Sequence, residues 1–152
     1  MKRRHARIVV MLLALVGGLF GSAQASAAPA QPVGTAGYVV NTATVPANGQ
    51  VNCFGYVGIF KPGTHVVVIN WDSTPLNECF GVTTDRTIWH TWQGAGAWTR
   101  MPGNGHADDV VSMAPENPDG GRLVVVYVAG SPTHWCQEYV PGSGWTGIWG
   151  TC

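Results

Sequence analysis

Charged residues, helical patterns and long hydrophobic runs are all scarce in this chain. Charged residues make up 11% of its 152 positions. After residue 36, glycine and proline interrupt the sequence so often that no window of 11 residues has the i, i+3, i+4 apolar spacing of an amphipathic helix. The longest apolar run, residues 8–20, is shorter than the roughly 20 residues that a membrane-spanning helix needs. We therefore expect neither a helical fold nor a membrane span.

The first 27 residues have the features of a secretory signal peptide. Four of the eight basic residues of the chain fall within the first seven positions. The apolar run 8–20 follows, and Ala25-Ser26-Ala27 supplies an A-x-A cleavage site. The pattern predicts cleavage after Ala27 and a secreted, extracellular protein.

The part of the chain that follows this peptide has few groups for binding polyanions or metals. It keeps four basic residues against eight acidic ones, a formal charge of −4 with histidine neutral. Without a cluster of Lys and Arg, binding to nucleic acid or to anionic lipid is not expected. Its four histidines are scattered, and none lies two or four residues from another. We expect neither a metal site nor a cofactor.

All four cysteines lie in this exported part, at Cys53, Cys79, Cys136 and Cys152. An even number of cysteines in an oxidising compartment predicts two disulfides. Three pairings are open, and the two short loops favour Cys53–Cys79 and Cys136–Cys152. A zinc site is not expected, because no C-x-x-C knuckle is present.

Short runs of β-branched and aromatic residues alternate with turn residues through most of the chain. Residues 28–36 are rich in Ala, Pro and Gly and predict a disordered leader. Residues 37–152 predict one all-β domain of short antiparallel strands, linked by disulfides. An offset of about 46 residues places Trp89 on Trp135 and suggests two propeller-blade-like repeats, at about 65–110 and 111–152. A β-sandwich or a barrel is the alternative fold.

The first of these repeats carries the most distinctive motif. The runs DRTIWHTWQGAGAW (85–98) and DDVVSMAPENPDGGRLVVVYV (108–128) resemble the repeat of bacterial tectonin-like β-propeller lectins. The resemblance covers about residues 65–152 and implies blade-like sheets and carbohydrate binding. The second repeat departs from the pattern, because WCQEY (135–139) lacks the histidine and the second tryptophan. Two blades cannot close a ring alone, so the resemblance permits a trimer. The two disulfides instead favour a monomer slightly.

Tryptophan is abundant, with seven residues between positions 71 and 149. Indole rings can stack on the C–H faces of sugars, while amide, imidazole and carboxylate groups bond the hydroxyls. Because side chains alternate along a strand, His90 and Trp92 should share one face and Trp89 should lie on the other. The candidate ligand-binding residues are His90, Trp92, Gln93, Glu138, Tyr139 and Trp145.

No pattern for catalysis stands out. Glu116 and Asp119 lie among prolines and glycines in a predicted turn, and Gly142-Ser143-Gly144 is not a G-x-S-x-G elbow. The chain is therefore expected not to be an enzyme. The favoured function is a secreted, lectin-like carbohydrate-binding module whose partner is a glycan or a cell-surface polysaccharide. A secreted protease or glycosidase inhibitor and a cell-envelope surface protein remain open as alternatives.

Overall fold

The computed structural model describes residues 38–71, 74, 76–111, 113 and 115–152. This part of the chain contains eleven strands and no helix, which confirms the all-β prediction. It accordingly has no helix that is long and apolar enough to cross a membrane. The predicted signal peptide and leader, residues 1–36, lie outside the described residues.

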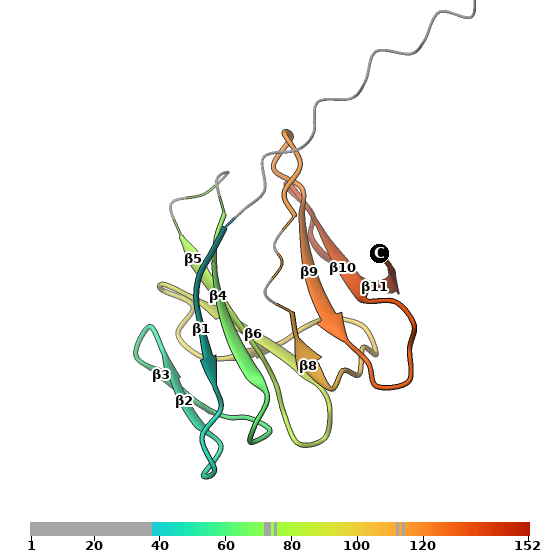
Figure 1. Cartoon of the computed structure of the whole chain (residues 1–152). Helices are drawn as coiled ribbons and strands as arrows, with labels where there is room; N and C mark the ends of the chain where they lie inside the picture. The colour runs from blue at the N-terminus through green and yellow to red at the C-terminus, as the bar shows by residue number, and fades with distance from the viewer. Residues whose placement is uncertain (1–37, 72–73, 75, 112, 114) are drawn as a thin grey trace, which may run out of the picture. The chain divides into compact units, whose positions relative to one another are not determined.

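Two antiparallel sheets and one hairpin make up the domain (Figure 1). In spatial order, the first sheet contains β1 (Tyr38–Thr44), β4 (His65–Asn70), β5 (Asn77–Val82), β6 (Ile88–Trp92) and β7 (Thr99–Arg100). The second sheet contains β11 (Gly144–Thr151), β10 (Trp135–Val140), β9 (Arg122–Tyr127) and β8 (Asp109–Val110). The separate hairpin consists of β2 (Gln50–Cys53) and β3 (Tyr56–Ile59).

The main core lies between the two sheets. Alternation along β4 points Val67 and Ile69 into this core, and alternation along β9 does the same for Val124 and Val126. The buried members of the core are Val67, Ile69, Trp71, Phe80, Val82, Ile88, Met101, Ala107, Val110, Val124 and Val126. Two sheets that share one core form a β-sandwich, the alternative fold class, and not a closed barrel.

A second, outer cluster covers the other face of the first sheet. It contains Val45, Cys53, Phe60, Val66 and Cys79. Phe60, which follows β3, is 1% exposed, and its ring centroid lies 4.5 Å from that of Trp98. Because this cluster covers the outer face as well, β4 and β5 are largely buried on both sides, in contrast to the alternating pattern of a half-exposed strand.

Each predicted repeat corresponds largely to one meander of four consecutive antiparallel strands. These meanders are β4-β5-β6-β7 and β8-β9-β10-β11. The predicted equivalence of Trp89 and Trp135 is wrong, however. Trp89 pairs with Gly81 and packs in the outer cluster, whereas Trp135 pairs with Val126 and packs against the main core. The loop between β9 and β10 is longer than that between β5 and β6, and a register change of one residue moves a side chain to the opposite face. The relation to propeller blades stays a prediction.

Both disulfides have the pairing that the sequence favours. Cys53–Cys79 joins the hairpin to β5, and Cys136–Cys152 joins β10 to the residue that follows β11. No cysteine among the described residues is free. Two disulfides fit an extracellular protein, because thiols in the cytosol are kept reduced.

Three loops are joined by the carboxylate of Asp108. It accepts a backbone hydrogen bond from Ala129 at 2.8 Å and pairs with Arg86 at 3.0 Å and Lys61 at 3.4 Å. The Ala129 N–H, followed by Lys61 and Arg86, holds the pKa of Asp108 below its usual value of 3.8. The charged carboxylate is therefore favoured more in the folded state than in the unfolded chain.

We expect Asp108→Asn to make stability less sensitive to acid. A carboxylate whose pKa is lowered by folding contributes stability above its unfolded pKa of about 3.9, and loses it as the pH falls through the lower folded value. Urea unfolding of both proteins from pH 7 to pH 2 should thus show the wild type more stable at pH 7 and the difference shrinking below about pH 4. Asp119→Asn, in the turn before β9, serves as the control. A constant difference across this range would contradict the assignment.

Candidate functional site

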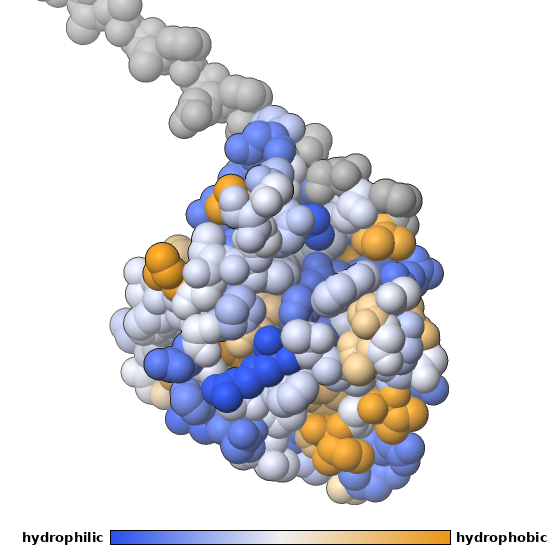
Figure 2. Space-filling model, turned by 180° about the vertical axis from the view of Figure 1, so that it is seen from behind, coloured by the Kyte–Doolittle hydropathy of each residue, from blue (hydrophilic) through white to orange (hydrophobic). Residues whose placement is uncertain are grey.

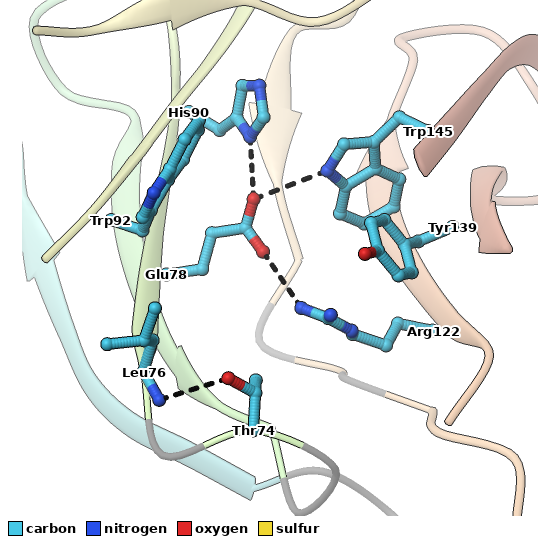
Figure 3. Close-up of a pocket in the computed structure, with 8 residues that line it drawn as sticks. All are labelled: Thr74, Leu76, Glu78, His90, Trp92, Arg122, Tyr139 and Trp145. Atoms are coloured by element: carbon cyan, nitrogen blue, oxygen red, sulfur yellow. Dashed lines mark hydrogen bonds and ion pairs between the residues drawn. The ribbon is translucent and has the colours of Figure 1, made fainter. Parts of the chain in front are cut away.

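A pocket of about 290 Å³ opens between the two sheets, where β5, β6, β9, β10 and β11 bring polar and aromatic side chains together. The first sheet supplies Glu78 from β5 and both His90 and Trp92 from β6. The second sheet supplies Arg122, Tyr139 and Trp145, one from each of its three longest strands. Figure 3 shows these two groups facing each other, with Thr74 and Leu76 at one side.

Glu78 is the centre of this pocket, and its carboxylate is bonded on both oxygens. Oε1 accepts from His90 Nδ1 at 2.6 Å and from the indole N–H of Trp145 at 3.3 Å. Oε2 accepts from the indole N–H of Trp71 at 2.9 Å and lies 3.6 Å from an Arg122 guanidinium nitrogen. A carboxylate offers about four acceptor positions; three of them take hydrogen bonds here, and Arg122 adds an ion pair. Glu78 therefore organises the pocket and has little capacity left for a ligand.

The pattern of the strands explains why these charges are buried. Glu78 lies on the same face of β5 as Phe80 and Val82, and Arg122 lies on the same face of β9 as Val124 and Val126. The Glu78 side chain is 6% exposed and that of Arg122 is 13% exposed. Charges in such positions need partners, and here Glu78 accepts hydrogen bonds from three side chains while Arg122 is ion-paired with Glu78 and lies against the Tyr139 ring.

Aromatic rings form the walls around this carboxylate. The Trp92 ring lies 5.3 Å from the ring of His90, and the Tyr139 ring lies 5.5 Å from that of Trp145 in an edge-on arrangement. The guanidinium of Arg122 is 4.0 Å from the Tyr139 ring centroid, within cation–π range. In Figure 3, Trp92 lies on one side of Glu78, and Trp145 and Tyr139 lie on the other. The pocket thus combines flat apolar walls with a charged, hydrogen-bonded base.

Four of the six predicted ligand-binding residues line this pocket: His90, Trp92, Tyr139 and Trp145. As expected, His90 and Trp92 share one face of β6 while Trp89 lies on the other. The predicted Gln93 does not line it, because it follows the last residue of β6 and is exposed. The predicted Glu138 does not line the pocket either. It is the strand neighbour of Tyr139, so its side chain points to the opposite, outer face of the second sheet.

Glu78 and Arg122 line the pocket but were not among the residues predicted from the sequence. The signal was present in the alternation, since each is a charged residue at an inward position of an otherwise apolar strand. Thr74 and Leu76, from the segment before β5, were missed as well and carry no such signal.

Comparison with known proteins leaves the chain without an assigned relative. No protein-family model, no curated protein and no solved structure matches it. Among the described residues, no group of three or more His, Cys, Asp or Glu side chains is placed to hold a metal ion. The function must accordingly be argued from the geometry of the pocket.

Proposed function

We propose that this chain is a secreted, lectin-like carbohydrate-binding module that takes one sugar ring into the Glu78 pocket. The observation that carries the proposal is the pair of indoles, Trp92 and Trp145, placed on either side of a bonded Glu78–His90–Arg122 group. Indole faces suit the C–H faces of a sugar, and the polar groups of His90 and Arg122 that line the pocket suit its hydroxyl oxygens.

The volume of the pocket limits the size of the ligand. Small-molecule sites usually measure about 300–1,000 Å³, and this pocket, at about 290 Å³, is at the lower limit. One sugar ring, or the terminal ring of a longer glycan, is the matching size. The proposed partner is therefore the end of a glycan chain, presented for example by a cell-surface polysaccharide.

The carboxylate chemistry favours binding over hydrolysis. Glycoside hydrolysis commonly uses two carboxylates, about 5–9.5 Å apart, on either side of the bond that is cleaved. Among the described residues that line the pocket, Glu78 is the one carboxylate, and its oxygens already accept three hydrogen bonds and form an ion pair with Arg122. This arrangement supports a site that holds a sugar without cleaving it.

The surface gives less support to the alternative of a cell-envelope protein held by exposed aromatics. All seven tryptophans are buried or half-buried. The back of the domain in Figure 2 shows apolar areas in orange that are separated by hydrophilic ones. The large hydrophobic side chains that are exposed are Val57, Ile59, Leu76, Met113, Tyr127, Val140 and Ile148.

A glycan array followed by calorimetry with the best soluble saccharide tests the proposal. We expect saturable binding with one sugar unit per Glu78 pocket, and an affinity at least about tenfold lower for Trp145→Ala, because a base-sized ring stacked on an aromatic is worth about 1–3 kcal/mol in other stacking sites. Ile148→Ala is the matched control, since Ile148 lies on the same strand but is 75% exposed. Absence of glycan binding, together with inhibition of a protease or glycosidase, would overturn the proposal in favour of the inhibitor alternative.

A further inference from the structure

A second pocket, of about 440 Å³, lies at the other end of the second sheet. Along β10, Trp135 is at one end and Tyr139 of the first pocket is near the other. Along β11, Trp149 and Trp145 are divided between the two pockets in the same way. The second pocket is lined by Asn104, Gly105, His106, Val126, Val128, Ala129, Gly130, Ser131, Trp135 and Trp149.

Gln137 separates the two pockets. It lies on β10 between Trp135 and Tyr139 and has no exposed surface. Its side-chain amide donates to the carbonyl of Pro102 at 2.9 Å, and its side-chain carbonyl accepts from the N–H of Gly147 at 3.2 Å. Both ends of the amide are therefore fixed, and a ligand in one pocket does not extend into the other. The second pocket must have a ligand of its own.

The lining of the second pocket differs in chemistry from that of the first. Its residues include no Asp, Glu, Lys or Arg, whereas the first pocket is built around the Glu78–Arg122 pair. The Trp135 indole is held in place by a hydrogen bond from its N–H to Ser131 Oγ at 3.1 Å. Fixed indoles and aliphatic side chains favour a flat apolar ligand over a charged or strongly hydrated one.

The Trp149 indole adds one polar requirement. Its N–H is buried and has no hydrogen-bond partner among the described residues. Buried donors are nearly always paired, so this unpaired N–H points to an acceptor that a ligand would bring. Gly105 lies directly against the indole nitrogen, and a Cβ at that position would collide with it. A ligand acceptor reaches the N–H only if Gly105 moves aside.

We propose that this pocket, defined by Trp135 and Trp149, binds a neutral planar aromatic compound that carries a hydrogen-bond acceptor. The ring system lies against the indole of Trp135 and the side chains of Val126 and Val128. The acceptor group of the ligand accepts a hydrogen bond from the Trp149 N–H. The segment around Gly105 shifts to make room for it. Nothing in this inference depends on the first pocket binding a sugar, because Gln137 keeps the two sites apart.

Coumarin is a suitable probe, since it is planar, neutral and carries one lactone carbonyl. Coumarin is titrated into the ¹⁵N-labelled, oxidised protein. The signals followed are the seven indole N–H groups, assigned with single Trp→Phe variants, and the backbone N–H of Gly105. We expect saturable shifts at Trp149, Trp135 and Gly105, with little change at Trp92 or Trp145. Naphthalene, which is planar but has no acceptor, should bind at least about tenfold more weakly, as expected for one lost buried hydrogen bond.

Two variants make the test decisive. Trp135→Ala should weaken coumarin binding at least about tenfold, and Trp145→Ala should leave it within about twofold. If Trp135→Ala does not fold, Ala129→Phe decides, because residue 129 is exposed at the rim and the larger side chain blocks the entrance. Non-saturating shifts, shifts confined to Trp92 and Trp145, or wild-type affinity in Ala129→Phe would each overturn the proposal. None of these outcomes bears on sugar binding at the Glu78 pocket.

Discussion

Glu78→Ala should lower the free energy of unfolding by about 3–5 kcal/mol and abolish ligand binding in the first pocket. The substitution leaves the Arg122 guanidinium buried without its counter-charge, and leaves His90 Nδ1 and the indole N–H groups of Trp71 and Trp145 without their acceptor. Loss of one partner of a buried ion pair costs far more than loss of a surface pair, because the remaining charge is only slightly exposed to water.

Glu138→Ala is the matched control for this effect. Glu138 is also a strand glutamate, but it is exposed on the outer face of the second sheet. Its removal should change the free energy of unfolding by no more than about 0.5 kcal/mol, as is usual at the surface. Urea unfolding at neutral pH measures both. Equal stability losses in the two variants would show that Glu78 is not the organising residue described here.

Trp89→Ala should mainly lower stability and Trp92→Ala should mainly lower ligand affinity, although the two residues belong to the same strand. Trp89 packs in the outer cluster and donates its indole N–H to Thr87 Oγ1 at 2.9 Å. Its replacement should cost about 3 kcal/mol, at the lower end of the range for core tryptophans because Trp89 is only half-buried. Trp92 is half-buried too, but it lines the pocket. Its replacement should cost less than about 1 kcal/mol in stability and at least about tenfold in affinity.

Thermal melts and saccharide titrations of both variants separate these two roles. Trp92→Phe is the control for the second variant, because it keeps an aromatic face and should recover most of the lost affinity. If Trp92→Ala proves the less stable protein of the two, the faces of β6 have been assigned the wrong way round.

Local pattern was sufficient to predict an all-β fold and one half of the site, and short loop lengths favoured the observed disulfide pairing. The alternation of β6 places His90 and Trp92 on one face whatever the rest of the fold does, and the structure agrees. The same rule could have rejected Glu138 as a neighbour of Tyr139, because adjacent strand residues point to opposite faces. Gln93 was misplaced for a different reason, since the strand ends at Trp92 and alternation no longer applies.

Long-range pairing was what the sequence could not supply. Glu78 and Arg122 belong to different sheets and are 44 positions apart, so only the packing of the two sheets brings them together. The strand register within each hairpin could not be predicted from the sequence either. The offset of 46 residues matched Trp89 with Trp135 by residue type, but loop length sets the pairing partner, and it placed the two indoles on unlike faces.

The Cys136–Cys152 disulfide has a consequence for where this domain can work. β11 is an edge strand whose only neighbour in its sheet is β10, and it supplies Trp145 to one pocket and Trp149 to the other. Besides the main chain through residues 141–143, the disulfide is the one covalent link of the β11 end to β10 among the described residues. In a reducing medium, the end of β11 beyond its turn would be held to β10 by backbone hydrogen bonds and side-chain packing alone, and such chain ends open at low free-energy cost. Reduction of this disulfide by glutathione would therefore affect both pockets together, although neither of its cysteines lines either pocket.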